Sequence, residues 1–233
     1  MRAMLNDRVA GRAPSQDRGS TAGASSTDDW REDGRRLDLA VYAAIAATPT
    51  PKLDDFFRRV SGAADRSRLW IVTAALVAAL GGRAGRRAAA DGLASVGLAS
   101  ATVNLVLKPL GGRRRPSRDT NNVPVARQVP MPETTSFPSG HAASAFAFAS
   151  GASFALPAVG FPLNLAAAVV AYSRVHTGVH YPADVVAGAV AGAALAPIAV
   201  AARRDLARRA AARARSPKRG DDMSRRPPRR SSP

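Results

Sequence analysis

The chain has 233 residues, a formal net charge of +17 and no cysteine. Its length allows one domain of ordinary size together with polar ends. The lack of cysteine excludes disulfides, thiolate metal sites and cysteine nucleophiles. The basic residues flank apolar stretches and do not alternate with aromatic side chains, so nucleic acid is not expected as a partner.

Both ends of the chain are polar. Residues 1–36 contain no sustained apolar run, and residues 203–233 carry twelve Arg or Lys against three Asp. Such segments cannot bury enough apolar surface to offset chain entropy, so we predict a disordered tail at each end. The first thirty residues also lack the apolar core of a cleavable secretory signal, so membrane segments should drive any export. The folded domain is predicted over 37–202.

The segment 37–66 leaves the number of membrane crossings open. Its apolar part, 37–47, is too short for a span, and the sequence TPTP interrupts it. The following residues 53–59 are amphipathic. They predict either an interfacial helix or part of a sixth crossing, which would place the N-terminus in the cytoplasm.

Five apolar stretches rich in Ala and Gly follow. Two of them approach the roughly 20 residues that cross a bilayer core, and three are shorter. Arginines follow the first and the last stretch, which places those ends in the cytoplasm under the positive-inside rule. The crossings then alternate, so that 108–141 and 173–184 meet on the extracytoplasmic side. The stretches are 69–82, 88–107, 142–157, 159–172 and 185–202.

These stretches predict an all-α fold, an integral-membrane bundle of about six helices. The small residues Gly188, Gly192 and Ala196 would let neighbouring helices approach closely in lipid. Asp91 lies inside an apolar stretch and should face the bundle, because a carboxylate facing lipid is costly. On segment length alone, the alternative is a soluble, alanine-rich helical bundle.

Residues that can carry chemistry gather at the predicted extracytoplasmic ends of these helices. Three cations stand there, and guanidinium groups suit bidentate contact with phosphate oxygens. A Pro-Ser-Gly sequence opens one helix, so its amides and the serine hydroxyl can point at an anion. The three clusters are Lys108 with Arg115-Pro116, then Pro138-Ser139-Gly140-His141, then Ser173-Arg174 with His180 and Asp184.

Two histidines of these clusters can perform a phosphoryl transfer. Asp184 lies four residues after His180, close enough to accept a hydrogen bond from one ring nitrogen and leave the other free for attack. His141 could protonate the leaving oxygen and later activate water. The clusters lack the carboxylates of a Mg²⁺ or two-metal site, so neither a metal nor another cofactor is expected.

Other charged residues lie outside this pattern. Arg113, Arg114, Arg118 and Arg127 are interpreted either as solvated loop charges or as contacts for an anionic headgroup, since they run against the positive-inside rule. Within the arginine triplet 113–115, spacing favours the last as the site residue. His176 is interpreted as a structural or rim residue.

The three clusters, in this order and spacing, resemble the type 2 phosphatidic acid phosphatase (PAP2) superfamily, of the lipid phosphate phosphatase type. The resemblance covers about 37–202 and implies a six-helix core and a metal-independent phosphatase. It implies that His180 is the nucleophile that forms a phosphohistidine, that Asp184 supports it, and that His141 is the general acid. By the same resemblance, the phosphate is bound by Lys108, Arg115, Ser139, Gly140 and Arg174.

The chain also resembles the phosphatase half of bacterial proteins that fuse this domain to a diacylglycerol-kinase-like domain. No second domain of that kind is visible here, so nothing about kinase activity follows.

The expected substrate is a lipid phosphate or a polyprenyl (di)phosphate in the cell membrane. Phosphatidic acid, phosphatidylglycerol phosphate, undecaprenyl diphosphate and a polyprenyl-phosphoribose phosphate all fit. One alternative is an acid phosphatase or a vanadate-dependent haloperoxidase-like enzyme that acts on a soluble substrate. The other is a non-catalytic membrane protein whose basic C-terminal tail, in the cytoplasm, recruits a partner.

Overall fold

The computed structural model describes residues 26–215, and these contain helices but no strand. Predictions for residues 1–25 and 216–233 lie outside the described residues. The chain divides into two compact units, Met1–Leu37 and Asp38–Pro233. The first unit ends inside helix α1 (Ser26–Ala47), and its described part is helical, with an exposed ion pair between Glu32 and Arg35. The remaining description concerns the second unit.

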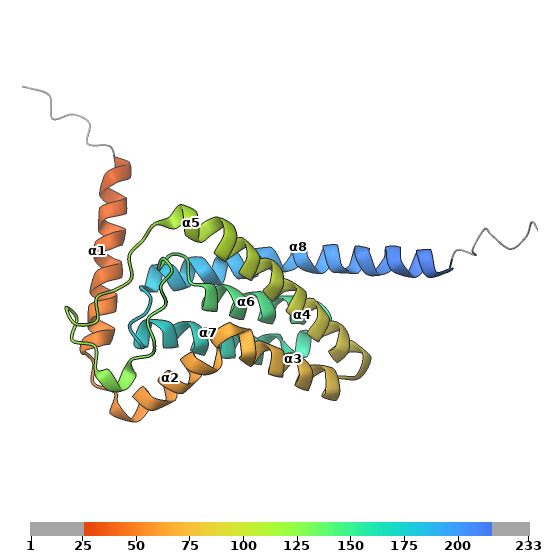
Figure 1. The fold of residues 1–233 in the computed structure, drawn as a ribbon, viewed down its shortest axis with the longest axis horizontal. Helices are drawn as coiled ribbons and strands as arrows, with labels where there is room; N and C mark the ends of the chain where they lie inside the picture. The colour runs from red at the N-terminus through yellow and green to blue at the C-terminus, as the bar shows by residue number, and fades with distance from the viewer. Residues whose placement is uncertain (1–25, 216–233) are drawn as a thin grey trace, which may run out of the picture. The chain divides into compact units, whose positions relative to one another are not determined.

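The second unit confirms the all-α prediction. Its π-helical turn, Val103–Leu107, continues α4 directly into α5, so the two form one helix. Counted in this way, the described residues form seven helices longer than one turn, one more than about six. After α1 they are α2 (Pro51–Ala63), α3 (Arg68–Leu80), α4 (Gly82–Thr102) with α5 (Lys108–Gly111), α6 (Gly140–Ser153), α7 (Gly160–His176) and α8 (Pro182–Arg215) (Figure 1).

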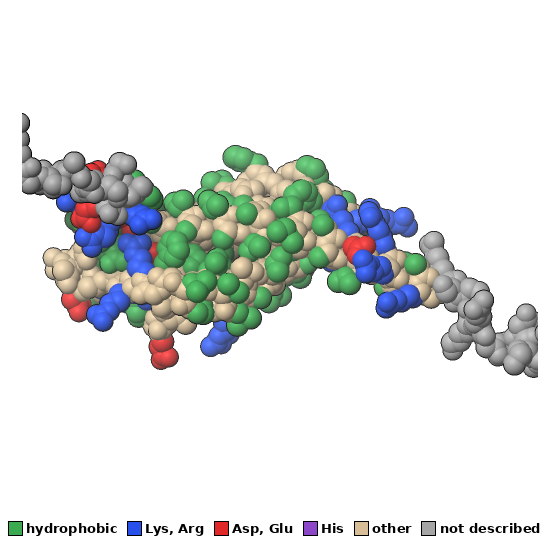
Figure 2. Space-filling model, turned by 90° about the horizontal axis from the view of Figure 1, so that it is seen from above, with side chains coloured by type: hydrophobic (Ala, Val, Ile, Leu, Met, Phe, Trp, Pro, Cys, Tyr) green, Lys and Arg blue, Asp and Glu red, His purple; other side chains and the backbone are tan. Residues whose placement is uncertain are grey.

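Three helical segments are long and apolar enough to cross a membrane: Gly82–Gly111, Pro157–His176 and Pro182–Ala214. Each contains one of the predicted apolar stretches. The outer surface of the bundle is also apolar, with Leu105 76% exposed and Phe161 81% exposed. Figure 2 shows hydrophobic side chains over the middle of the bundle and Lys and Arg gathered towards its ends. The chain is therefore a membrane protein.

The other predicted spans, 69–82 and 142–157, correspond to α3 and α6. These helices have 13 and 14 residues, fewer than the roughly 20 that span a bilayer core. The amphipathic stretch 53–59 lies in α2, which has 13 residues and is likewise short.

Helix α6 forms the centre of the bundle and packs against α4, α7 and α8 (Figure 1). Its close approach to α8 depends on glycine, because a Cβ at Gly188 would overlap the carbonyl oxygen of Ser139. A Cβ at Gly192 would overlap the carbonyl oxygen of Ala143 in the same way. The predicted close contact through small residues is therefore confirmed. Ala196, one turn further along α8, is fully buried.

Asp91 lies inside the bundle, as predicted, and is fully buried. Its carboxylate is held by Arg203 and by Arg204, whose Nη2 lies 2.8 Å from Oδ2. Both arginines lie in α8, beyond the predicted end of the domain at residue 202.

Helices reach into both segments that were predicted as tails, since α1 begins at Ser26 and α8 continues to Arg215. Alanine and arginine are strong helix formers, and Asp205 pairs with Arg209 one turn later. The domain limits 1–36, 37–202 and 203–233 stay a prediction.

Candidate active site

The carboxyl ends of α5 and α7 meet the amino ends of α6 and α8 at one end of the bundle. Lys108 reaches this end immediately after the π-helical turn. One extra residue in a turn rotates the following side chains by about 100°. The Lys108 ammonium donates to the Thr134 hydroxyl at 3.1 Å, and a Cβ at Gly140 would lie 3.9 Å from its nitrogen.

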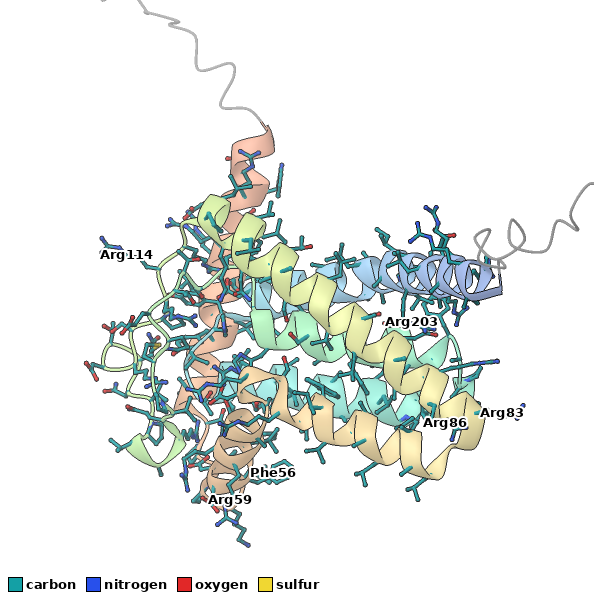
Figure 3. All side chains as sticks on the ribbon, turned by 45° about the vertical axis from the view of Figure 1, so that its right-hand side comes forward. Phe56, Arg59, Arg83, Arg86, Arg114 and Arg203 are labelled. Carbon is teal, nitrogen blue, oxygen red and sulfur yellow. The ribbon has the colours of Figure 1, made fainter. Side chains whose placement is uncertain are left out.

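The arginine triplet separates into three different roles. Arg115 donates to the backbone carbonyls of Thr134 and Val179, each at 2.8 Å, and its Nη1 also lies 3.2 Å from Nε2 of His180. Arg114 is exposed and points away from the bundle (Figure 3). Arg113 turns the other way and binds carboxylates. Of the three, the one favoured by spacing is the one that contacts His180.

His180 is almost fully buried, and its contacts define its tautomer. An arginine N–H can only donate, so Nε2, which faces Arg115, must be the acceptor. The neutral ring then carries its proton on Nδ1, which faces Oδ2 of Asp184 at 3.5 Å. The pKa of His180 is lowered to about 4, chiefly by burial and further by the positive charges of Arg115 and Arg174, while Asp184 acts in the opposite sense. The imidazole is therefore neutral at neutral pH.

Gly178 allows the chain to turn just before His180. Its φ is +72°, in the left-handed region that favours glycine. After this turn, the amide of His180 donates back to the carbonyl of Arg174 at 3.2 Å. The turn thus holds the histidine beside the end of α7.

Asp184 is completely buried and is held from several sides. It accepts from Arg113 Nη1 at 2.9 Å, from the backbone amide of Tyr181 at 2.9 Å, and from the hydroxyl of Ser136. Arg113 also donates to Asp38 at 2.6 Å, and its guanidinium lies over the Tyr181 ring. These contacts fix the carboxylate that faces His180.

Asp38 completes this arrangement from α1. One of its oxygens accepts from the amide of Ala183 at 2.7 Å, in the first turn of α8, and the other binds Arg113. Burial alone would lower the pKa of Arg113, but the hydrogen bonds and negative charges of Asp38 and Asp184 raise it. Arg113 and Asp38 are thus positioning residues around Asp184.

Ser139 is the N-cap of α6, and its hydroxyl accepts from the amide of Ala142 at 3.4 Å. Its own amide donates to the carbonyl of Asp184 at 2.9 Å, which joins the start of α6 to α8. The amides of the first helical turn, at Gly140 and His141, have no acceptor within the helix. They remain suited to an anion at the positive end of the helix dipole.

His141 projects from the first turn of α6, and its Nε2 lies 2.8 Å from Oδ1 of Asp65. Asp65 lies in the short 3₁₀ turn Asp65–Ser67 between α2 and α3. The hydrogen bond from His141 is the largest cause that holds the pKa of Asp65 below its usual value. Burial and the charges of Arg174 and Lys108 lower the pKa of His141, whereas the ionised carboxylate of Asp65 acts in the opposite sense and favours the protonated ring.

Arg174 is the most buried of the three site cations and is 2% exposed. Its Nη1 donates to the hydroxyl of Ser61 in α2. Lys108, Arg115 and Arg174 lie close enough to repel one another. Within residues 26–215, none of the three forms a salt bridge, whereas Arg113 has two. The three cations therefore leave their positive charge without a carboxylate partner among the described residues.

Three hollows adjoin these residues, and one of them is a pocket of about 340 Å³ along the arginine triplet 113–115. A pocket of about 320 Å³ is lined by Lys108, Gly140 and His141 together with Ser100 and Asn104. An apolar groove of about 290 Å³ lies beside them, and its lining includes the chain neighbours of Lys108 and Ser139. It is lined by Leu107, Leu110, Gly111, Phe137, Pro138 and Ala187.

A known protein family matches the part of the chain that contains these residues. The family model of the PAP2 superfamily matches residues 88–208. The chain belongs to the PAP2 superfamily. This match contains all eight predicted site residues, from Lys108 to Asp184.

Two solved structures are similar to this PAP2 protein. The crystal structure of Aquifex aeolicus LpxE has 25% sequence identity and a TM-score of 0.58, covering 70% of this chain and 94% of the other. The transmembrane PAP2-type phosphatidylglycerolphosphate phosphatase of Bacillus subtilis has 22% identity and a TM-score of 0.56, covering 74% and 87%. No curated protein matches. The expected likeness to the phosphatase half of a kinase fusion stays a prediction.

Several residues around the PAP2 site were missed or interpreted differently from the sequence. Arg127 is not a solvated loop charge: it is 1% exposed and donates to Asp54 at 2.8 Å. The same carboxylate contacts Nε2 of His176 at 3.1 Å, which supports the structural role expected for that histidine. The sequence did not predict Asp38 and Asp65 as site residues, because each is a single acidic residue in an ordinary helical or turn segment.

Proposed function

We propose that this PAP2 protein is a metal-independent phosphatase that hydrolyses a lipid phosphate or polyprenyl (di)phosphate at the extracytoplasmic face. The observation that carries the proposal is the unpaired cation group Lys108, Arg115 and Arg174 beside a neutral, oriented histidine. Electrostatic stabilisation by fixed cations and amides is the main requirement of phosphoryl transfer.

In the first step, Nε2 of His180 attacks the phosphorus and forms a P–N bond while the P–O bond to the lipid breaks. Arg115 must release Nε2, and its Nη1 then binds a phosphate oxygen instead. The proton on Nδ1 stays with the ring and faces Asp184, which stabilises the positive charge that develops on the imidazole. His141 gives its proton to the departing lipid oxygen.

In the second step, His141 accepts a proton from water, and the water oxygen attacks the phosphorus. The P–N bond breaks, inorganic phosphate leaves and His180 returns to its neutral form. Asp65 supports both steps, because its carboxylate stabilises His141 when that ring is protonated.

The lipid part of the proposal is supported by the apolar groove beside Lys108. The groove opens next to the phosphate-binding residues, and its wall includes Leu110, which is 80% exposed. An acyl or prenyl chain can lie there while its phosphate reaches the cations. The phosphatase of Bacillus subtilis is named for such a lipid, phosphatidylglycerolphosphate.

The test is phosphate release by the detergent-purified protein with EDTA present. The panel contains phosphatidic acid, phosphatidylglycerol phosphate, undecaprenyl diphosphate and p-nitrophenyl phosphate, and a His180→Ala protein runs alongside. Release from a lipid that disappears in the variant supports the proposal. Release from p-nitrophenyl phosphate alone would favour a soluble substrate, and no release by a folded protein would favour a non-catalytic role. Trapping of an acid-labile phosphoprotein in the wild type and not in His180→Ala tests the phosphohistidine.

A further inference from the structure

A pocket lined by five arginines lies at the opposite end of the bundle from the active site. It has a volume of about 790 Å³ and is enclosed by the start of α4, the end of α6 and the last turns of α8. Figure 3 labels Arg83, Arg86 and Arg203 at this end. We call it the arginine pocket, and its lining residues are Arg83, Ala84, Arg87, Phe154, Ala155, Arg203, Arg204, Ala207 and Arg208.

The arginine pocket has far more positive than negative charge. The buried carboxylate of Asp91 is already paired with Arg203 and Arg204. Arg83, Arg87 and Arg208 form no ion pair with any residue of the described part of the chain, and no acidic residue lines the pocket. These three exposed guanidinium groups line one pocket and are free to donate to an anion. The charge pattern therefore points to a bound anion.

The chemistry of the lining is that of binding and not of catalysis. Besides arginine, the lining contains only Ala and Phe, with no histidine, hydroxyl or carboxylate to transfer a proton or attack a phosphorus. Arginine forks match phosphate oxygens in a bidentate manner. Three unpaired guanidinium groups exceed the single charge of one phosphodiester, so a ligand with two phosphates matches them better.

An apolar groove adjoins the arginine pocket. It has a volume of about 270 Å³ and includes Leu80 and Leu156 in its walls. Leu80 of the groove lies three residues before Arg83 of the pocket in the chain. Likewise, Ala155 of the pocket directly precedes Leu156 of the groove. Leu80 is 85% exposed. A charged pocket beside an apolar groove matches an amphipathic ligand, whereas a soluble polyanion would leave the groove uncovered.

We propose that the arginine pocket binds a phospholipid whose headgroup carries two phosphates, with one acyl chain in the groove lined by Leu80 and Leu156. The lipid belongs to the leaflet opposite the active site, because the α4–α5 helix and α8 connect the two ends and are long enough to cross the membrane. Basic pockets between transmembrane helices recognise such headgroups. The proposal does not depend on the proposed phosphatase activity.

The experiment measures Tm of the full-length, detergent-purified protein during titration with cardiolipin, a phospholipid with two phosphates. The test variant combines Arg83→Gln, Arg87→Gln and Arg208→Gln, which leaves the contacts of Asp91 in place. The matched control combines Arg86→Gln, Arg209→Gln and Arg213→Gln, three charges from the same helices outside the pocket. Parallel titrations use phosphatidylcholine and sodium pyrophosphate.

Cardiolipin should raise the Tm of the wild type and of the control. In the test variant, the apparent Kd for cardiolipin should increase at least tenfold. Phosphatidylcholine should have no such effect. Equal weakening in both variants would overturn the proposal, because it would show a general attraction to basic charge. An equal response to pyrophosphate would reassign the pocket to a soluble polyanion. Retained phosphate release by the test variant would separate this result from any failure of the active-site proposal.

Discussion

The two ends of the helical bundle both gather arginines, but they hold them differently. At the active-site end, Arg115 donates to backbone carbonyls, and Arg113 is fixed between two carboxylates. At the opposite end, Arg83 and Arg87 are exposed. The first arrangement holds each side chain through several contacts, and bond making depends on such fixed geometry. The second supplies charge to a ligand that can settle in more than one orientation. Substitutions at the active-site end should therefore act by moving side chains, whereas substitutions at the opposite end should act by changing the number of positive charges.

The largest expected effect is loss of the nucleophile at the geometrically fixed end. His180→Ala should reduce kcat by a factor on the order of 10⁴ to 10⁶, as removal of a catalytic nucleophile does in other hydrolases. Steady-state phosphate release measures this loss. An unchanged Tm would show that the fold is intact, whereas retention of full activity would contradict the assignment of His180.

His141→Ala should reduce kcat by about 10² to 10⁴, the usual contribution of general acid–base catalysis. Asp65→Asn should have a smaller effect, because Asp65 acts through His141 and does not touch the phosphate in the proposed steps. Two substrates, one with a good leaving group and one with a poor leaving group, test whether His141 acts as the general acid. A p-nitrophenyl ester needs little protonation, so its hydrolysis should be less sensitive to His141→Ala than hydrolysis of a lipid ester.

Arg127→Ala tests a buried ion pair at the active-site end that does not include the proposed catalytic residues. Arg127 pairs with Asp54 in the interior and donates to the carbonyl of Thr48. Removing one partner of a buried pair costs about 3–5 kcal/mol in the free energy of unfolding. We expect a lower Tm with nearly normal kcat at low temperature. A normal Tm would mean that this network is not needed for stability.

The pH dependence should distinguish the cations that influence His180. The neutral ring is the proposed nucleophile, and its pKa is about 4, so activity should fall as the pH drops through this value. Arg115 is one of the charges that lower this pKa, so Arg115→Ala should move the acid limb of kcat/KM to higher pH. Arg115→Lys keeps the charge and should move it less. An acid limb that is identical in all three proteins would contradict the electrostatic coupling.

The smallest effect is expected at the opposite end. Arg83→Gln removes one exposed charge far from the reacting atoms. It should change kcat by less than about twofold, since isolated surface charges contribute little. A large decrease of kcat would show that the two ends are coupled and do not act independently.

The sequence predicted residues whose chemistry depends on their type and spacing. His180 and Asp184 are four residues apart at the start of a helix, and Ser139 begins another helix, so both patterns can be read locally. The family match over 88–208 is consistent with those patterns. The helical fold was predictable for a similar reason, because long Ala-rich stretches have few other ways to satisfy their backbone.

The residues that were missed depend on contacts between distant segments. Asp38 reaches the amide of Ala183, and Asp65 reaches His141, across separations that no local pattern reports. Arg127 was interpreted as a loop charge or a headgroup contact, because its partner, Asp54, belongs to a distant helix. The π-helical turn before Lys108 was equally hidden, since the apolar sequence VNLVL does not distinguish it from an ordinary helix.

The glycines of α8 have a consequence for how this enzyme can diversify. At Gly188 the α8 backbone lies against the carbonyl of Ser139, and at Gly192 against that of Ala143. Any larger side chain would force the two helices apart and carry His180 and the start of α6 in different directions. Natural or laboratory evolution therefore cannot widen the space around His180 by substitutions at the contact between α6 and α8. Under the proposed function, new substrate preferences should arise instead at the apolar groove, at Leu110, which is 80% exposed and can be replaced without changing the spacing of the helices.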